Sequence, residues 1–343
     1  MPSPSLPSPD ALLHLARASA GPVRLAGGAV LFSQPQAVAQ VHGLAHDALL
    51  PLTPAWGPQV DLLPVLEPSL ARLSQAAGRA ASVALRPVSS GEGLAKVACR
   101  GLGSALFGAD HDTFGSPLPA ALDGLAEEPG EASCGKLAFL VGRFLPRRRE
   151  SGEGADVLSA ALELEPDDGE ALSRVVSLAR VALPSAAALL QWAVLQVAVD
   201  PSSVQPLEPA AFVRELLRLY PPAWLQRFSA TRPVEVGGVR LAAGDEAWTS
   251  PFVTQRLEQL HAEPDRFLPR RAGLQAGYAF FPFGTRDGGA LGQVVERVVA
   301  ESLRAFVATA RATAPDGMPP PEAGEVLHPA GPVRLDLQRR GIS

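Results

Sequence analysis

The stretch RELLRLYPP, residues 214–222, places a carboxylate and a guanidinium three positions apart, at Glu215 and Arg218. Side chains three apart lie on one face of a helix, so these two groups can pair before Pro221 and Pro222 end the helix. An exposed pair of this kind stabilises a helix by only about 0.2–0.5 kcal/mol, and a solvated surface pair is its ordinary interpretation. The segments that follow it in the chain favour a different interpretation.

After this helix the chain keeps a recognisable order of elements. VEVGGVRL (234–241) predicts two short strands that turn at Gly237-Gly238, and EAWTSPF (246–252) predicts a third strand. The turn EPDRFLP (263–269), the glycine-rich stretch FPFGTRDGGALG (281–292) and a helix over 290–312 come next. This order resembles the C-terminal part of a cytochrome P450. The resemblance implies a mainly α protein with small β-sheets and the cytochrome P450-like fold, shortened in the region before the third helix.

The first part of the chain predicts a hairpin and several helices. PVRL (22–25) and AVLF (29–32) read as two strands around Gly27-Gly28. Helical periodicity begins at 34–42 and returns over 61–85, while PRRRESGEG (146–154) predicts a polar connector. A long helix is expected over about 168–199, ending before Pro201.

The expected domain organisation is simple. Residues 1–20 form a Pro/Ser-rich N-terminal segment, and residues 21–343 form a single P450-like domain. Within that domain we expect a helix-rich core at about 44–220 and a β-containing region with the meander and glycine loop at about 221–343.

Composition excludes several classes of protein. The 343-residue chain is 47% hydrophobic and 19% charged, which excludes wholesale disorder. Its net charge of −5 and pI of about 5.7 argue against nucleic-acid binding. The apolar run 181–199 is interrupted by polar residues and predicts a buried helix, not a membrane span. Two distant cysteines and the lack of a signal-peptide pattern predict a cytoplasmic protein without a membrane partner.

The resemblance assigns structural and cofactor-contact roles to a few residues. Glu215 and Arg218 are expected to form a buried network with Arg266 of the EPDRFLP turn. Arg227, in RFSATRPVEVGG (227–238), matches an arginine that reaches a heme propionate in the family. HDALLPLTPAW (46–56) resembles the helix of the H-x-x-x-R signature, so His46 keeps a propionate position while Leu50 replaces the arginine.

The glycine-rich stretch lacks the family's axial ligand. The family pattern is F-x-x-G-x-R-x-C-x-G, and alignment on Phe283, Gly284 and Gly292 places Ala290 at the cysteine and Gly288 at the arginine. Moving Arg286 onto the arginine leaves Gly288 at the cysteine instead. Neither residue has a donor atom for iron, and the thiolate is what favours O–O cleavage in the family. We therefore predict no cofactor, with heme bound only in the absence of thiolate ligation.

The long helix also lacks a residue that the family uses for its chemistry. The family places an acid and an alcohol at its middle to deliver protons, whereas VALPSAAA (181–188) has Pro184 and Ser185 there. Ser185 can donate a hydrogen bond, but Pro184 has no acidic group. The proton relay is therefore expected to be absent.

The resemblance also predicts which residues line a pocket. The wall on the long helix is Ala182, Leu183, Pro184, Ser185 and Ala186, and the wall after the E-x-x-R helix is Ala223, Trp224 and Leu225. Ser185, Arg227, Arg286 and Asp287 are the candidates for acid–base or oxyanion roles, and no catalytic residue is assigned among them. Two arrangements of the loop stay open: Arg286 or Asp287 folds inward to join Arg227 and His46, or both point to solvent.

No metal site is predicted. His42 and His46 stand four apart, a spacing that can bind zinc, but no third ligand is predictable nearby and inherited or surface histidines are the simpler interpretation. Cys99 and Cys134 are expected to be structural thiols.

Three functions remain open at this point. The first is an auxiliary protein, similar to the heme-free P450-like partners of glycosyltransferases in bacterial natural-product biosynthesis, that binds a glycosyltransferase or another biosynthetic enzyme. The second is a heme-free enzyme that uses the pocket for a cyclisation or isomerisation of a small natural-product intermediate. The third is an atypical heme-binding oxidoreductase.

Overall fold

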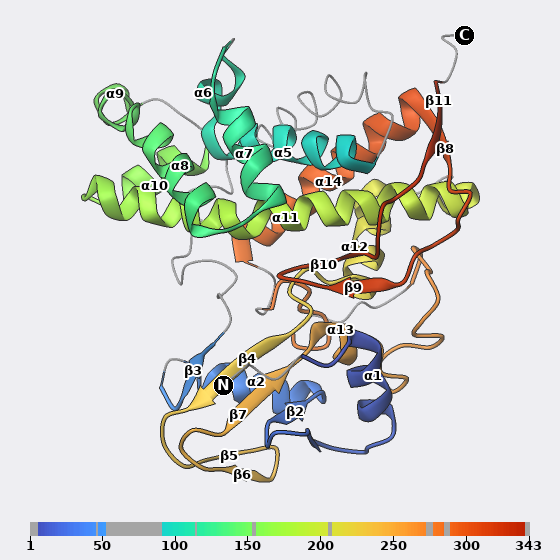
Figure 1. The fold of residues 1–343 in the computed structure, drawn as a ribbon. Coiled ribbons are helices and arrows are strands. Elements are labelled where there is room, and N and C mark those ends of the chain that lie inside the picture. Colours follow the sequence, from blue (N-terminus) through green and yellow to red (C-terminus); the bar gives the residue numbers. More distant parts are fainter. Residues whose placement is uncertain are drawn as a thin grey trace. The chain divides into compact units, whose positions relative to one another are not determined.

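The computed structural model describes residues 6–45, 47–52, 91–113, 115–152, 156–204, 208–271, 277–284 and 289–339 (Figure 1). The chain divides into two units. The β unit comprises Met1–Trp56, Glu215–Gly288 and Pro321–His328, and the helical unit comprises Gly57–Arg214, Gly289–Pro320 and Pro329–Ser343. The expected boundary between the helix-rich and β-containing parts, near residue 220, falls close to the observed boundary at Glu215. The N-terminal hairpin, however, also belongs to the β unit.

In the helical unit, α11 (Asp168–Val199) packs against α5 (Gly91–Phe107), α7 (Leu118–Glu127), α8 (Glu131–Gly142), α10 (Val157–Leu164) and α14 (Gly289–Thr309). The unit also contains α6 (Ala109–Asp112), α9 (Leu145–Ser151), the short 3-10 helix η2 (Pro201–Val204) and an antiparallel pair of strands, β8 (Ala310–Thr313) and β11 (Asp336–Arg339).

Sequence features set both ends of α11. The Asp167 side chain accepts a hydrogen bond from the backbone N–H of Glu170 at 2.9 Å and so caps the first turn. Pro201 follows the C-terminal cap Asp200 and starts η2. Within the described residues, this is the one helix long and apolar enough to cross a membrane, but 89% of its most apolar window is buried in the protein. It is a core helix, as predicted.

The β unit is built on a five-stranded sheet with the order β1-β2-β7-β4-β3. β1 (Val23–Arg24) and β2 (Val30–Phe32) form the expected N-terminal hairpin. β2 runs parallel to β7 (Glu246–Thr249), which pairs antiparallel with β4 (Gln226–Ala230), and β4 pairs antiparallel with β3 (Leu49–Pro51). The sheet therefore joins segments that lie about 200 positions apart in the sequence, a pairing that local patterns do not reveal.

The remaining elements of the β unit are short. The predicted Gly237-Gly238 hairpin is present as β5 (Val234–Val236) and β6 (Val239–Leu241), and both glycines have positive φ. β9 (Pro321–Ala323) pairs with β10 (Leu327–Pro329). The helices are α1 (Pro9–Arg17), α2 (Pro35–Gly43) and α13 (Pro251–Thr254), while α12 (Pro209–Leu219) begins in the helical unit and ends in the β unit.

Three expectations need correction. The stretch 47–52 contains strand β3 where the H-x-x-x-R helix was expected, because Leu49, Leu50 and Pro51 pair with β4. The polar connector at 146–154 is largely helix α9. The C-terminal helix ends at Thr309, and residues 310–313 are strand β8. α1 lies in the Pro/Ser-rich segment, where Ser8 caps it. The helix predicted over 61–85 lies outside the described residues.

Candidate functional site

The E-x-x-R pair is buried, not solvated. Glu215 and Arg218 on α12 have side-chain exposures of 1% and 0%. Arg218 Nε and Nη2 donate to the two Glu215 carboxylate oxygens at 2.9 Å each, which is the bidentate geometry of a strong charge-assisted pair. Removal of one partner would leave a buried charge unpaired, a change that typically costs about 3–5 kcal/mol.

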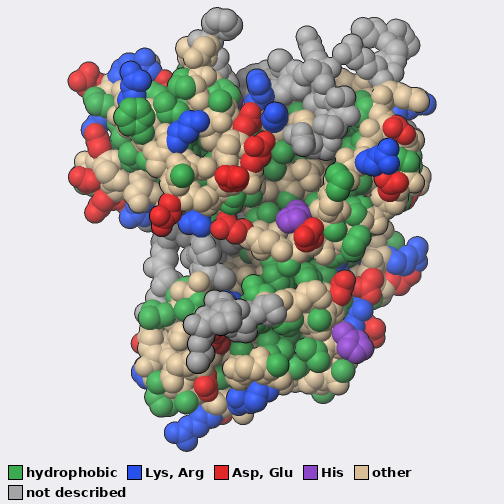
Figure 2. Space-filling model, in the orientation of Figure 1, with side chains coloured by type: hydrophobic (Ala, Val, Ile, Leu, Met, Phe, Trp, Pro, Cys, Tyr) green, Lys and Arg blue, Asp and Glu red, His purple; other side chains and the backbone are tan. Residues whose placement is uncertain are grey.

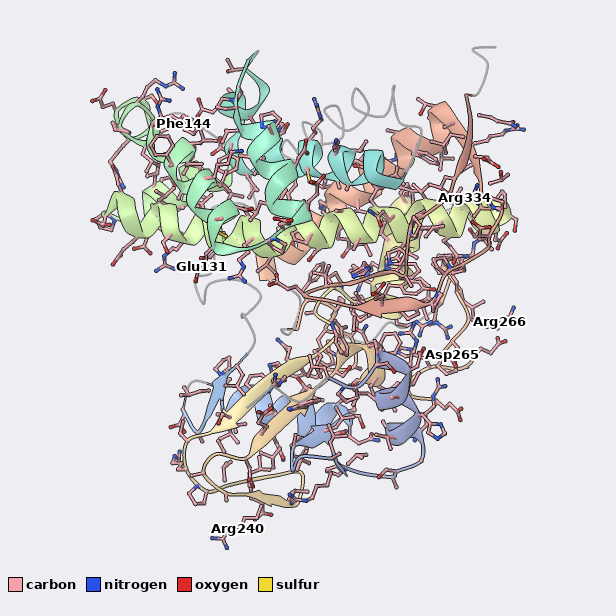
Figure 3. All side chains as sticks on the ribbon, in the orientation of Figure 1. Glu131, Phe144, Arg240, Asp265, Arg266 and Arg334 are labelled. Carbon is pink, nitrogen blue, oxygen red and sulfur yellow. The ribbon has the colours of Figure 1, made fainter. Side chains whose placement is uncertain are left out.

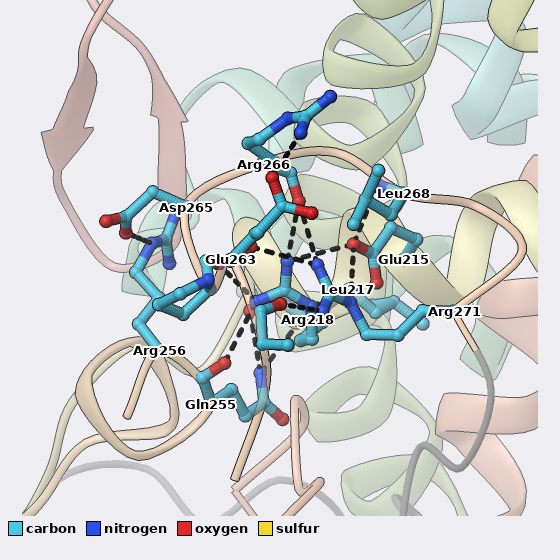
Figure 4. Close-up of polar contacts among 12 residues, drawn as sticks. Glu215, Leu217, Arg218, Gln255, Arg256, Glu263, Asp265, Arg266, Leu268 and Arg271 are labelled. Atoms are coloured by element: carbon cyan, nitrogen blue, oxygen red, sulfur yellow. Dashed lines mark hydrogen bonds and ion pairs between the residues drawn. The ribbon is translucent and has the colours of Figure 1, made fainter. Parts of the chain in front are cut away.

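Arg218 also binds the backbone of the segment from Gln255 to Arg266, which we call the meander. Its Nη1 donates to the carbonyls of Gln255 and Pro264, at 3.0 and 2.6 Å, and Nη2 donates to the carbonyl of Arg266 at 3.1 Å (Figure 4). The guanidinium therefore fixes α12 against a segment with little regular structure of its own. This is the scaffold role that the resemblance predicted.

The third charged side chain of the network is Arg271, not the predicted Arg266. Arg271 Nε lies 3.2 Å from Glu215 Oε1, and its side chain is 8% exposed. The Arg266 side chain is 67% exposed, projects away from the protein and pairs with Glu263 (Figures 3 and 4). Arg266 takes part through its backbone carbonyl alone, which accepts from both Arg218 and Arg271.

Gln255 connects this network to the glycine-rich stretch. Its side chain is buried; Nε2 donates to the carbonyls of Leu217 and Arg218, at 3.1 Å each, and Oε1 accepts from the Phe281 N–H at 2.8 Å. The amide thus provides hydrogen-bond donors to two carbonyls in the last turn of α12 and an acceptor to the Phe-Pro-Phe-Gly turn.

The Phe-Pro-Phe-Gly turn has a structural basis in the residues around it. Phe281 and Phe283 are buried, and Gly284 has φ +77°. A Cβ at Gly284 would lie 2.2 Å from Gln226 Nε2, so only glycine fits without displacing that buried amide. The Gln226 Oε1 atom is buried without a hydrogen-bond partner among the described residues.

His42 packs among aromatic rings beside this turn. It stacks on Tyr278 with ring centroids 4.7 Å apart, and the edges of Phe228 and Phe281 lie 5.3 and 6.0 Å away. Its Nε2 is 3.3 Å from Thr249 Oγ1. Burial lowers the pKa of His42 to about 4, so the ring is neutral near pH 7. His42 is therefore a partly buried residue packed against aromatic rings.

Arg227 is paired within the sheet. Its Nε and Nη2 donate to Glu246 Oε2 and Oε1 at 3.0 and 2.9 Å, and its guanidinium lies 5.3 Å from the Trp248 ring centroid. Trp248 Nε1 donates to the same Oε2 at 2.7 Å. The propionate position predicted for Arg227 thus carries a carboxylate from this chain.

The predicted pocket residues are divided between the two units. Ala182, Leu183, Pro184, Ser185 and Ala186 are buried on α11 in the helical unit. Ala223, Trp224 and Leu225 are buried in the β unit, where Trp224 Nε1 donates to the carbonyl of Gly324. Ser185 Oγ donates to the Val181 carbonyl at 2.7 Å, one turn back on the same helix. That these residues line one pocket stays a prediction.

Three of the predicted site residues, His46, Arg286 and Asp287, lie outside the described residues, so both loop arrangements stay predictions. Ala290 is in the first turn of α14. Alanine offers no donor atom to a metal, whatever the conformation of the loop.

The described residues contain no cluster of metal-binding side chains. No group of three or more His, Cys, Asp or Glu side chains among them could hold a metal ion. Cys99 is buried in α5, where burial raises the pKa of its thiol, and Cys134 is on α8. On the face shown in Figure 2, acidic and basic side chains are interspersed, in keeping with the net charge of −5.

Comparison with known proteins identifies the class. No protein-family model matches the chain. Over 209 residues it is 27% identical to cyclooctatin synthase of Streptomyces melanosporofaciens, covering 50% of this chain and 46% of that protein. Over 136 residues it is 35% identical to pentalenene oxygenase of Streptomyces avermitilis, covering 37% and 30%. The chain therefore spans less than half the length of these relatives.

The fold is that of the cytochromes P450. The structure superimposes on a six-coordinated cytochrome P450 from Thermus thermophilus with a TM-score of 0.67 and 25% identity, covering 95% of this chain and 97% of that chain. The mainly helical architecture with small sheets is thus confirmed. Together, the names of the relatives and the structural neighbour support the cytochrome P450 superfamily for this chain.

Proposed function

We propose that this chain is a P450-fold protein without heme-thiolate chemistry that acts in the cytoplasm as an auxiliary partner of another enzyme in natural-product biosynthesis. A glycosyltransferase is the partner class that its resemblance to heme-free family members favours. The relatives named for cyclooctatin and pentalenene, both from Streptomyces, favour natural-product biosynthesis as the setting.

One observation carries the proposal: groups that the family directs at heme are absent or bonded within the protein. Arg227 is paired with Glu246, and Ser185 Oγ is bonded to the carbonyl of Val181. Ala290 replaces the cysteine and Pro184 the acid. The residues present do not fit a thiolate-ligated heme, whereas the E-x-x-R network that holds the fold is complete.

The same bonds weaken the two alternatives. A heme-free cyclase or isomerase needs an acid, a base or an oxyanion donor available to its substrate. Ser185 and Arg227, two of the four candidates, already have partners inside the protein. An atypical heme-binding oxidoreductase would need a ligand that neither Ala290 nor Gly288 supplies.

The first test is the absorption spectrum of the protein expressed with a heme precursor, beside a P450 of known heme content. We expect no Soret band that titrates to one heme per chain, and such a band would overturn the proposal. The second test expresses the chain with the glycosyltransferase encoded nearest to its gene. We expect a stable complex and higher transferase activity, whereas an unchanged transferase would contradict the auxiliary role.

A further inference from the structure

The strand register places Arg227, Glu246 and Trp248 on one face of the β-unit sheet. Arg227 is directly opposite Trp248 in the antiparallel β4–β7 pair, and Ser229 is opposite Glu246. Residues two apart on a strand share a face, so the guanidinium, the carboxylate and the indole converge on that side. The two strands alone build this arrangement, without a loop.

Two exposed leucines extend the same face to the edge of the sheet. Leu50 on β3 is opposite Ser229, and the Leu52 N–H donates to the Arg227 carbonyl at 2.8 Å. The two leucines are each 48% exposed. The face thus places an apolar edge beside a cation, two groups that an apolar molecule bearing a carboxylate can contact together.

Glu246 changes what this face can bind. It accepts two hydrogen bonds from Arg227 and one from Trp248, all at 3.0 Å or shorter. The carboxylate is held in a fixed orientation by three donors, and at 29% exposure the ion pair is only partly solvated. A ligand carboxylate must therefore displace Glu246 before it can pair with the Nε–Nη2 edge of the Arg227 guanidinium.

We propose that Glu246 is a built-in counter-ion that closes the Arg227 anion position and makes this sheet face reject carboxylate ligands. This inference rests on the proposed absence of heme chemistry and names the residue that enforces it at the former propionate position. The counter-ion role of Glu246 requires no bound ligand in the wild-type protein. It also accounts for a buried indole N–H that points at a carboxylate of its own chain.

The test compares hemin, which has two carboxylates, with its dimethyl ester, which has none, as probes of the purified protein stripped of any bound heme. Glu246→Gln keeps the size of the side chain and removes its charge. We expect Glu246→Gln to bind hemin about fivefold to tenfold more tightly than wild type, since a partly exposed pair competes by roughly 1 kcal/mol. Binding of the dimethyl ester is expected to be unchanged.

Two further variants keep the test decisive. Arg227→Gln added to Glu246→Gln is expected to remove the gain, because the gain needs the positive charge of Arg227. Glu246→Asp, which shortens the carboxylate, provides a second way to loosen the pair if Glu246→Gln does not fold by circular dichroism. An equal gain for the ester, or no gain in a folded variant, overturns the counter-ion role. Stoichiometric heme in freshly expressed wild type would refute both the proposed function and the exclusion of carboxylates by Glu246, whereas an equal gain for the ester overturns the counter-ion role alone.

Discussion

Substitution of Arg271 is the sharpest test of the network at Glu215. Arg271→Ala removes a guanidinium 3.2 Å from a carboxylate that is 1% exposed, together with hydrogen bonds to the carbonyls of Glu263 and Arg266. A hydrogen bond to a charged group contributes about 1.5–3 kcal/mol, so we expect a loss of about 2–3 kcal/mol in the free energy of unfolding. At about 2 °C per kcal/mol for a chain of this size, the melting temperature should fall by about 4–6 °C.

Arg266→Ala is the matched control, because Arg266 is close in sequence and was the member expected by resemblance. Its side chain is 67% exposed and pairs with a Glu263 that is 52% exposed, so the expected loss is about 0–1 kcal/mol. Both variants are measured by thermal and urea unfolding followed by circular dichroism. If Arg266→Ala destabilises as much as Arg271→Ala, the assignment of Arg271 to the network is refuted.

Three further predictions follow from other buried groups. Gln255→Leu should lower the free energy of unfolding by about 2–4 kcal/mol in urea titrations, because it leaves an N–H and two carbonyls without partners. His42, whose pKa is lowered from 6.5 to about 4, favours the neutral form in the folded state, so stability should decline as pH falls from about 6.5 to 4 and His42→Gln should flatten that decline. Gly103→Ala should destabilise by about 1–3 kcal/mol, since its Cβ would lie 2.4 Å from His111, whereas Gly135→Ala in an open position of α8 should stabilise by up to about 1 kcal/mol, both read from urea midpoints.

Local sequence patterns were sufficient to predict the elements whose structure depends on residues adjacent in the chain. The Gly237-Gly238 hairpin follows from the left-handed backbone that both glycines adopt. The long helix follows from its capping aspartate and from the proline after its end. The E-x-x-R helix was also correct, since Glu215 and Arg218 are separated by one helical turn.

The features that sequence patterns did not predict depend on contacts between segments that are distant in the chain. Leu49, Leu50 and Pro51 were taken for helix because they follow a histidine in a familiar pattern, yet β4 recruits them into the sheet from about 180 positions away. Arg271 was missed because the resemblance pointed to Arg266, and only the fold of the meander decides which side chain turns inward. Glu246 had no signal of its own, since its partner lies on a neighbouring strand.

Under the proposed function, the features that this chain keeps and those that it lacks follow from one energetic difference. Loss of a buried member of the Glu215–Arg218 network leaves an unpaired charge in the interior and threatens the fold itself, so substitution there is costly. In the proposed function, a ligand cysteine, an acid on α11 and the Arg227 guanidinium would serve a cofactor and contribute little to folding. The proposal therefore allows alanine and proline at the first two positions, and a counter-ion such as Glu246 beside the third, without loss of the scaffold. The E-x-x-R motif is therefore a marker of the fold, and inference about chemistry has to rest on the positions that folding leaves unconstrained.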